Sequence, residues 1–570
     1  MVHDWGGRWS DEGWTLGTWA PKASEVALIL NGQAQPMTRN ADGFWTATAP
    51  ARPGDTYLLR VDGQEIPDPA SRLQSGDVHA PSVVVAPADD RPQAGWRGRD
   101  WSEAVIYEMH LGTFTPQGTL GAAAEKLADL ADLGVTAVEL MPLGQWQGDR
   151  GWGYDGVLPY ALHPTYGTPD DLRRFVDQAH SLGIMVILDL VMNHFGPEGA
   201  YLHHAAPPFF DEARHTPWGA AIDFSQPAVR EYWIQCAEYW IGEYRMDGLR
   251  LDAVHQISGP GAKDFMTTFA GRIRAVDKSR AIHLIVEDER NERFLRENGY
   301  DASWNDDFHH AVHVQLTGES DSYYASFAHD PFGDLCLALE RGHIEEGQPR
   351  PGRDEPRGEP CGDLPPTGFV NSTQTHDQVG NRALGERLLS LADPQGVKVA
   401  YALLLTAPYV PMIFMGEERG ATTPFLFFAD FEGDLAKAVR EGRAAEFAGI
   451  ASLGSKVPDP LSPDTFARSK LDWSAGANAA EWLDLTAHAL AFRRDAVVPL
   501  LKSGRSRPAH VARHGAASAH ATWFFNAGTL DLRLSLGQAD GGLQPLGGAG
   551  FSLGRIGQDP FAISVSARLS

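Results

Sequence analysis

The sequence predicts a three-part α/β protein, in which a (β/α)8 TIM barrel follows a β-sandwich and precedes a smaller antiparallel β domain. Between residues 104 and 501, short apolar segments alternate with segments of helix length, which is typical of a closed parallel barrel. Before and after this region the chain shows short alternating runs between turn residues, which indicate antiparallel sheets. We therefore expect an immunoglobulin-like sandwich at residues 1–95, the barrel at 96–502 and a C-terminal β domain at 503–570.

The composition fits a large globular chain with an uncharged ligand. Of 570 residues, 43% are hydrophobic, and the formal net charge is -26. Such a charge repels phosphate backbones and anionic lipids, so neither nucleic acid nor membrane is expected as a partner. A mean hydropathy of -0.28 and the lack of an apolar run of about eighteen residues argue against a membrane span. Three scattered cysteines and a start without a secretion signal predict the reducing cytoplasm.

The first 85 residues contain five runs with the two-residue period of strands. These runs are 14–20, 25–30, 43–49, 56–63 and 82–85. The dipeptide Asn31-Gly32 after the second run predicts a tight hairpin turn. The following segment, 86–100, is rich in Ala, Pro, Asp and Gly and has no periodicity, so it is interpreted as a linker.

Eight strands are predicted for the barrel. They are residues 104–110, 135–141, 184–190, 248–253, 282–287, 301–304, 368–371 and 410–415. Between them, the segments 119–133, 169–182 and 227–244 place apolar side chains three and four positions apart, as amphipathic helices do. Ser225 is in a position to cap the third of these helices. A last helix at 479–494 is expected to close the barrel.

Two long irregular segments interrupt the barrel pattern, and loops of this length are usually functional or disordered. Residues 195–224 follow the third strand, and we expect this short insertion to face the substrate. Residues 341–366 are rich in Pro, Gly and charge and are expected to form a mobile surface loop. Beyond the last helix, the runs 510–526 and 530–537 show the strand period of the C-terminal domain.

The segment 247–255, DGLRLDAVH, carries an unusual strand. Its apolar side chains alternate with Arg250 and Asp252, so a guanidinium and a carboxylate leave the same polar face. Side chains at the carboxyl ends of barrel strands form the mouth of the active site. The polar strand ends of this chain are Asp189, Asn193 and His194, then Arg250 and Asp252, Glu287, His376 and Asp377, and Glu417. Retaining glycosidases need two such carboxyl groups about 5 to 5.5 Å apart, one a nucleophile and the other a proton donor with a raised pKa.

Four of these strand ends resemble, in order and spacing, the four motif regions of the α-amylase superfamily. The motifs are DLVMNH at 189–194, GLRLDAVH at 248–255, the glutamate of IVED at 285–288 and THD at 375–377. The resemblance implies a retaining double displacement at an α-glucosidic bond. By position in the motifs it implies that Asp252 is the nucleophile, Glu287 the general acid and base, and Asp377 the carboxylate that holds the ring hydroxyls.

The same resemblance implies roles for five neighbouring side chains. Arg250 would keep Asp252 ionised and oriented through a charge-assisted hydrogen bond. His194 and His376 would bind hydroxyls of the sugar in the cleavage subsite, and Tyr154, within GWGYD, would form the aromatic platform beneath that sugar. Asp189 would support Arg250 and His194.

Structural roles remain open for several of these residues. His194 and His376 could support neighbours without touching the sugar, and Tyr154 could simply pack its loop. The pairs His203-His204 and His309-His310 lack the carboxylate context of metal sites. The insertion after strand three is also shorter than the one that supplies calcium ligands in many amylases. No metal or other cofactor is therefore predicted.

Three further stretches resemble one subfamily, the malto-oligosyltrehalose trehalohydrolases. They are 151–180, 304–313 with 376–387, and 424–447. This resemblance implies hydrolysis of the α-1,4-glucosidic bond next to the terminal α,α-1,1-linked glucose pair of maltooligosyl trehalose, which releases trehalose and a maltooligosaccharide. It also implies related α-glucans as ligands and a maltooligosyl trehalose synthase as the functional partner.

Residues after strands four, six and eight are expected to recognise the trehalose end. After the nucleophile the common amylase pattern places Lys then His at the third and fourth positions, whereas this chain has His255 and Gln256. Trehalose has no reducing end and is bent, so its site must be short and lined by donors placed for that bend. The candidates are His255, Asp306, Asp307 and Phe427. A site whose polar groups pair with trehalose should disfavour a plain maltodextrin, because some of those groups are then left unpaired.

Two other functions remain open. A glucan branching enzyme, which converts α-1,4 to α-1,6 linkages on the same scaffold, would share the covalent intermediate but resolve it with a sugar hydroxyl instead of water. The stretch 424–447 favours the hydrolase. A catalytically silent carbohydrate-binding protein is the third alternative, but such proteins typically lose one of the three carboxylates, and all three are present here.

Overall fold

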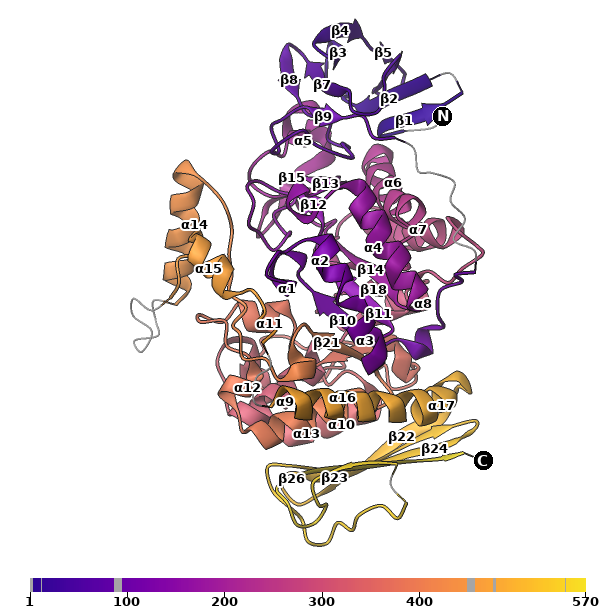
Figure 1. The fold of residues 1–570 in the computed structure, drawn as a ribbon, viewed down its shortest axis with the longest axis vertical. Coiled ribbons are helices and arrows are strands. Elements are labelled where there is room, and N and C mark those ends of the chain that lie inside the picture. The colour runs from indigo at the N-terminus through magenta and orange to yellow at the C-terminus, as the bar shows by residue number, and fades with distance from the viewer. Residues whose placement is uncertain are drawn as a thin grey trace.

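The structure is a computed structural model that describes residues 4–11, 13–86, 95–447, 457–474, 478–548 and 550–569. Two N-terminal sheets, a closed barrel and a C-terminal sheet follow one another along the longest axis (Figure 1). This arrangement confirms the predicted fold class. Within the described ranges, no helix combines the length and the apolar character that a membrane span needs.

Two antiparallel sheets form the N-terminal sandwich, with strand orders β1-β2-β6-β5 and β4-β3-β7-β8, and with β9 beside β7. The strands are β1 (Gly6–Ser10), β2 (Gly13–Trp19), β3 (Val26–Leu30), β4 (Gln33–Pro36), β5 (Thr38–Arg39), β6 (Phe44–Ala49), β7 (Thr56–Val61), β8 (Gln64–Ile66) and β9 (Ser82–Val83). The predicted hairpin is confirmed, because Leu30 pairs with Gln33 across Asn31 and Gly32. Both turn residues have positive φ, 48° and 77°, which asparagine and glycine tolerate.

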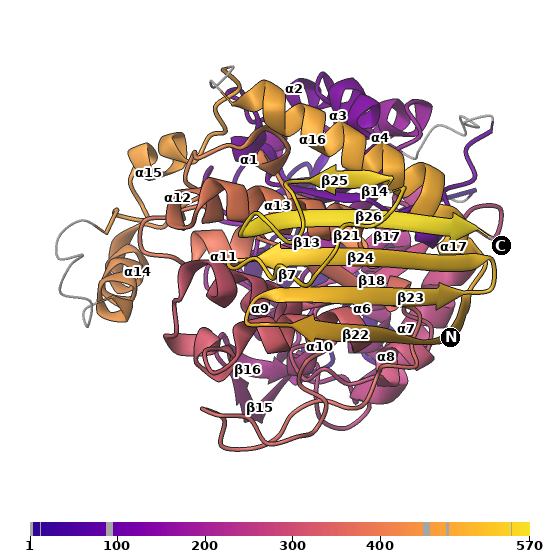
Figure 2. The same cartoon turned by 90° about the horizontal axis from the view of Figure 1, so that it is seen from below.

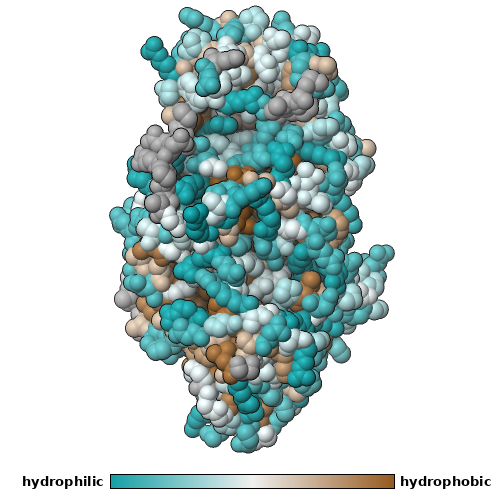
Figure 3. Space-filling model, turned by 90° about the vertical axis from the view of Figure 1, so that its right-hand side faces the viewer, coloured by the Kyte–Doolittle hydropathy of each residue, from teal (hydrophilic) through white to brown (hydrophobic). Residues whose placement is uncertain are grey.

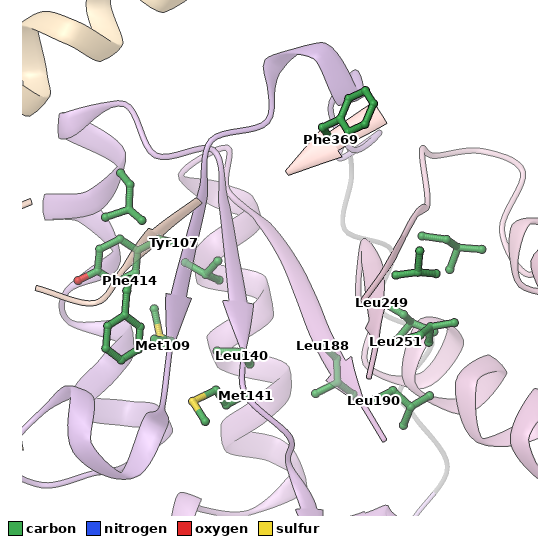
Figure 4. Close-up of a cluster of buried hydrophobic side chains, with 14 of the residues drawn as sticks. Tyr107, Met109, Leu140, Met141, Leu188, Leu190, Leu249, Leu251, Phe369 and Phe414 are labelled. Atoms are coloured by element: carbon green, nitrogen blue, oxygen red, sulfur yellow. The ribbon is translucent and has the colours of Figure 1, made fainter. Parts of the chain in front are cut away.

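Eight parallel strands close the barrel in the order β10-β11-β14-β17-β18-β19-β20-β21. They are β10 (Ile106–Met109), β11 (Ala137–Leu140), β14 (Met185–Leu190), β17 (Gly248–Leu251), β18 (His283–Val286), β19 (Ala302–Trp304), β20 (Phe369–Ser372) and β21 (Val410–Phe414). All eight predicted strands are therefore confirmed, with ends that differ by at most two residues. Apolar side chains such as Tyr107, Leu188 and Leu251 project from the strands into buried clusters (Figure 4).

Alternation along the strands also builds a polar layer inside the barrel. Ile106, Ala137 and Ile187 belong to one buried apolar cluster. Two residues further along the same strands stand Glu108, Glu139 and Asp189, which a period of two directs to the same side. Arg250 pairs with Asp189 in the strand register. The barrel interior thus changes from apolar to charged toward the carboxyl ends of the strands.

Helices follow most of the strands. They are α1 (Leu111–Phe114), α2 (Leu120–Ala124), α3 (Leu127–Leu133), α4 (Pro169–Ser181), α5 (Leu202–Ala205), α6 (Pro227–Glu243), α7 (Ala262–Ala275), α8 (Phe294–Glu297), α9 (Asp306–Thr317), α10 (Pro331–Arg341), α11 (His376–Gly380), α12 (Leu388–Leu391), α13 (Pro394–Thr406), α14 (Gly433–Glu446), α15 (Pro463–Arg468), α16 (Ala479–Phe492) and α17 (Val498–Lys502). The predicted helix 119–133 is interrupted between α2 and α3. The predicted Ser225 cap is wrong, because α6 begins after Gln226 and the Ser225 hydroxyl donates to Asp223 instead.

A five-stranded antiparallel sheet ends the chain, in the order β22-β23-β24-β26-β25. Its strands are β22 (Arg505–His514), β23 (Ser518–Phe525), β24 (Gly528–Leu536), β25 (Phe551–Leu553) and β26 (Phe561–Leu569). The sheet, yellow in Figure 2, covers one side of the barrel through α10, α13 and α16. The two C-terminal runs recognised in the sequence correspond to β22, β23 and β24.

The insertion after β14 contacts both the sandwich and the catalytic side of the barrel. Ala205 of α5 belongs to the buried core of the sandwich, and Tyr201 contacts His79 there. The insertion then forms a hairpin of β15 (Phe210–Thr216) and β16 (Gly219–Ile222). Trp218, 49% exposed at the tip of this hairpin, stacks on His194 with ring centroids 4.2 Å apart. One part of the predicted substrate-facing segment therefore joins two domains, and another part reaches a candidate site residue.

The predicted surface loop at 341–366 is exposed or half-buried over residues 346–360, but residues near both of its ends are buried. His343, Ile344, Glu345 and Cys361 are fully buried. The Glu345 carboxylate forms an ion pair with Arg353, at 2.7 Å, and another with Arg357. The loop thus folds against the barrel around a buried carboxylate. Its charge-rich composition does not predict that burial.

The predicted linker at 86–100 is described only in part, because residues 87–94 lie outside the described residues. Its last third is attached to the barrel. The Trp96 indole donates to Asp247, 2.8 Å away, and stacks on His180 with centroids 4.5 Å apart. On the face of the molecule seen in Figure 3, hydrophilic residues predominate and hydrophobic ones form scattered patches.

Candidate active site

A pocket of about 400 Å³ lies where β18, β19 and β20 end. Its lining residues are Glu287, Glu289, Asp306, His310, Ser322, Tyr323, Ala325, Ser326, Gly352, Arg353, Arg357, Asp377, Gln378 and Asn381. Two of the three carboxylates proposed from the sequence, Glu287 and Asp377, therefore share one cavity. The third, Asp252, is linked to Glu287 through Arg250.

Arg250 connects three carboxylates beneath this pocket. Its Nη1 lies 2.6 Å from Asp189 Oδ2 and 3.0 Å from Asp252 Oδ1, and its Nη2 lies 2.7 Å from Glu287 Oε2. The side chain is fully buried, with the guanidinium 3.9 Å from the ring centroid of Trp304. Charge-assisted hydrogen bonds at a buried position are strong and hold the paired groups in a defined geometry. Neighbouring strands thus hold the two proposed reacting carboxyls on one guanidinium.

The pKa values of these two carboxyls shift in opposite directions. Burial favours a higher pKa for Asp252, but the charge of Arg250 and a hydrogen bond from Asn193, 2.8 Å away, contribute to a pKa below its ordinary value. Burial raises the pKa of Glu287 well above its ordinary value despite Arg250, and the charge of Asp252 adds to the rise. One carboxyl therefore favours the ionised form and the other the protonated form, which is the division a nucleophile and an acid need.

Ala253 orients one of these groups through its backbone. It has φ of 40°, in the left-handed region, and its N–H donates to Glu287 Oε2 at 2.9 Å. A non-glycine residue in this region costs free energy and is often found at functional sites. Alanine gives no sequence signal for that conformation, so the sequence analysis missed this contribution.

His376 and Tyr154 lie face to face beside the pocket. Their rings stack with centroids 5.0 Å apart and an interplanar angle of 21°. His376 Nε2 is 3.4 Å from Asp377 Oδ1. The Tyr154 hydroxyl donates to Asp189 at 2.6 Å. The structure therefore brings these residues together, with Tyr154 held at its hydroxyl by Asp189 and at its ring by His376.

His194 is engaged on both ring nitrogens. Its Nε2 is 2.9 Å from the backbone oxygen of Tyr154, and its Nδ1 contacts the side-chain oxygen of Asn193. Trp218 covers one face of the ring. Both ring nitrogens of His194 therefore contact protein groups, and the charge of this histidine acts on Asp252.

The four residues proposed for the trehalose side occupy different places. Asp307 is not in the pocket lining, because its carboxylate accepts from the backbone N–H groups of Ile344 and Glu345, at 2.7 and 2.9 Å, and from Arg357 at 3.1 Å. The structure therefore places the Asp307 carboxylate against the loop 341–366 rather than in the lining of this pocket. Its neighbour Asp306 lines the cavity instead.

His255 and Phe427 lie near the cavity rather than in its wall. His255 Nε2 is 3.4 Å from Glu289 Oε1, and Glu289 lines the pocket. The Phe427 ring packs edge-on against Trp152, with centroids 5.3 Å apart, and Trp152 in turn contacts His376. Neither residue is among the lining side chains.

The histidine pairs outside this cluster contact other protein groups. The buried His309 bonds the Thr373 carbonyl at 2.7 Å and the Tyr324 hydroxyl at 3.1 Å, and the exposed His203 stacks on Phe210. In the part of the chain that the structure describes, no three His, Cys, Asp or Glu side chains gather as a metal site would require.

Two family models match the chain. Residues 90–219 match the α-amylase catalytic domain, and residues 4–78 match carbohydrate-binding module 48, the isoamylase N-terminal domain. A malto-oligosyltrehalose trehalohydrolase from Deinococcus radiodurans is 41% identical over 489 residues, which cover 84% of this chain and 80% of that protein. A crystal structure from Salmonella typhimurium, described as an α-amylase, has a TM-score of 0.94 at 44% identity and covers 100% of both chains. A 1,4-α-glucan branching enzyme from Bacillus caldolyticus is 30% identical over 47% of this chain.

The barrel with its matching catalytic domain makes this chain a glycoside hydrolase of the α-amylase family. The relative that is 41% identical to this chain covers 84% of it. The chain therefore belongs to the malto-oligosyltrehalose trehalohydrolases, and the branching-enzyme match is weaker and partial.

Proposed function

We propose that the chain cleaves the α-1,4-glucosidic bond next to the terminal trehalose unit of maltooligosyl trehalose with retention of configuration. The observation that carries this proposal is that Arg250 bonds both Asp252, whose pKa is lowered, and Glu287, whose pKa is raised and which lines the cavity. The substrate follows from the relative's name and from the pocket beyond Glu287. Both steps of the reaction can be written with groups of this chain.

In the first step, Glu287 gives its proton to the glycosidic oxygen while the Asp252 carboxylate attacks C1 from the opposite face. The C1–O bond breaks, trehalose leaves with the proton, and an ester joins C1 to Asp252. In the second step, the Glu287 carboxylate takes a proton from water, and the water oxygen attacks C1 as the ester breaks. Two inversions give a maltooligosaccharide of α configuration and restore both carboxyls.

Asp377 and His376 are proposed to hold the sugar ring during these steps. Asp377 lines the cavity and is 40% exposed at its side chain, so its oxygens can accept hydrogen bonds from hydroxyls. Tyr154 supplies a ring face beside them. Asp189 and His194 are proposed to support Arg250 and Asp252 rather than the sugar. Asp189 Oδ2 accepts from Arg250 and Tyr154, and both ring nitrogens of His194 contact protein groups.

The trehalose side is proposed to lie against the loop 341–366. Arg353 and Arg357 of this loop enter the pocket beside Glu289 and Asp306. Tyr323, 42% exposed, offers a ring on the same wall. Donors and acceptors that surround a short closed site fit a bent disaccharide with hydroxyls on both rings and no reducing end. His255 would act through Glu289, Asp307 through Arg357, and Phe427 through Trp152.

Replacing Arg357 by alanine is expected to change selectivity. The guanidinium bonds Asp307 at 3.1 Å and Glu345 on one side and lines the pocket on the other. We expect kcat/KM for maltooligosyl trehalose to fall about 10- to 100-fold, because polar partners are left unpaired. Cleavage of an unmodified maltodextrin of equal length should fall by less than about threefold.

Arg293→Ala is the matched control for this prediction. Arg293 also pairs with the loop, through Asp363 at 2.9 Å, but it does not line the pocket. Arg293→Ala should leave unchanged the ratio of kcat/KM for maltooligosyl trehalose to kcat/KM for maltodextrin. Equal losses on both substrates in Arg357→Ala would reject the placement of trehalose against this loop.

The proposed partner is an enzyme that makes the α,α-1,1 linkage at the reducing end of a maltooligosaccharide, a maltooligosyl trehalose synthase, because the substrate must be supplied. A cytoplasmic location is proposed with it. The three cysteines are unpaired and buried, which suits a reducing compartment. Cell fractionation tests the location, and trehalose formation from maltooligosaccharides by the two purified enzymes together tests the partnership.

A further inference from the structure

Glu108 of β10 makes two contacts with His376, although 268 residues separate them. Its Oε1 lies 2.6 Å from His376 Nδ1, and its Oε2 accepts the His376 backbone N–H at 3.1 Å. Both side chains are about 1% exposed. No step of the mechanism above uses Glu108, so a buried carboxylate in the floor of the site has no role yet.

This contact decides what the other ring nitrogen can do. A carboxylate oxygen accepts, so Nδ1 must carry a hydrogen, and only a protonated ring then also has a hydrogen on Nε2. Nε2 points to the Asp377 side, 3.4 Å from its Oδ1. A protonated His376 therefore presents a donor where the sugar hydroxyls are proposed to lie, whereas a neutral ring with its hydrogen on Nδ1 presents an acceptor.

The charges around His376 favour the protonated ring. The titratable groups that act on it are Glu108 from β10, Asp377 from α11 and Arg250 from β17, with Asp252, Glu139, His110 and the stacked Tyr154 also nearby. Burial alone would lower the pKa of His376, but the negative charges of Asp377 and Glu108 overcome it and raise the pKa to about 9. Arg250 opposes them only in part.

We propose that Glu108 is a positioning residue that keeps His376 doubly protonated and aims its Nε2–H at a hydroxyl of the bound sugar. The inference deepens the proposed function and rests on it for the identity of that sugar. The ionisation of His376, however, is a property of the free protein. It can therefore be tested without a substrate.

Glu139 offers a matched control on the next strand. It pairs with Glu108 in the register of β10 and β11 and is equally buried, about 1% exposed. Neither of its carboxyl oxygens has a hydrogen-bond partner among the described residues. Burial and the charge of Glu108 raise its pKa well above the ordinary value, so glutamine replaces a neutral group of the same shape there.

The first test follows His376 by NMR in the full chain labelled at histidine Cε1, with the signal assigned from its loss in His376→Gln. We expect the wild type and Glu139→Gln to titrate near pH 9, and Glu108→Gln to titrate below about pH 7, close to an ordinary histidine. A wild-type His376 that titrates near 6.5, or a Glu108→Gln variant that still titrates near 9, would overturn the inference whatever the substrate is.

The second test measures kcat and KM on maltooligosyl trehalose for the same variants. Glu108→Gln should lower kcat about 10- to 100-fold, as expected for loss of a charged hydrogen bond in the transition state, and Glu139→Gln should change it by less than about twofold. Glu108→Asp should recover part of the loss. A lowered histidine pKa without any loss of kcat would overturn the positioning role, while absence of trehalose in the wild type would count against the proposed function alone.

Discussion

Replacement of Asp252 by alanine is expected to abolish turnover while substrate binding stays measurable. The variant lacks the oxygen that attacks C1, so kcat should fall on the order of 10⁴-fold or more. Arg250 keeps Asp189 and Glu287 as partners at 2.6 and 2.7 Å, so the floor of the site should persist. Calorimetric titration with maltooligosyl trehalose should give a Kd within about tenfold of the KM of the wild type.

Rescue of activity by a small anion, azide, distinguishes loss of the nucleophile in Asp252→Ala from misfolding. The truncated side chain leaves space on the face from which C1 is attacked, so added azide should restore bond cleavage, with trehalose leaving and a maltooligosyl azide of β configuration forming. Asp264→Ala, which removes an exposed partner of Arg230, is the control and should keep wild-type turnover. Full activity in Asp252→Ala would reject the nucleophile assignment.

Glutamine at position 287 is expected to remove acid catalysis. The wild-type rate should fall as the pH rises through the raised pKa of Glu287, because the proton for the leaving group is then lost, and it should fall toward acid as Asp252 becomes protonated. Glu287→Gln should lose about 10² to 10⁴ in kcat/KM and also lose the alkaline limb that belongs to this acid. The measurement is the pH profile of kcat/KM on maltooligosyl trehalose.

A substrate whose leaving group needs no proton supplies the control. With α-maltosyl fluoride, formation of the ester should be much less affected by Glu287→Gln than with the natural linkage. Glu289→Gln, two residues away on the same cavity wall, should keep the alkaline limb. If Glu287→Gln retains that limb, another group is the acid.

The fold could be predicted from the sequence because its signals are local. Each barrel strand is a short apolar run followed by a longer amphipathic one, and the hairpin at Asn31-Gly32 is specified by two residues that accept positive φ. The gathering of Glu287 and Asp377 at one cavity also follows from strand order alone, since carboxyl ends of barrel strands meet at one mouth.

Contacts that depend on the path of a loop could not be predicted. The sequence of residues 341–366 does not predict that a buried Glu345 pairs with Arg353 and Arg357. Nor does it predict that the Asp307 carboxylate accepts the backbone N–H of Ile344 instead of lining the cavity. The Glu108 to His376 contact spans 268 residues, so no periodicity reports it. Ala253 has a left-handed backbone conformation, which the residue type alanine does not predict.

Product analysis by NMR tests the central claim most directly. Wild-type protein is mixed with maltooligosyl trehalose, and the anomeric protons are followed from the first minute. We predict equal amounts of free trehalose and of a maltooligosaccharide whose new reducing end appears first in the α form and reaches the α/β mixture only later. A new end that appears first as β, cleavage within the glucan chain without trehalose, or new α-1,6 signals without reducing ends would contradict the claim.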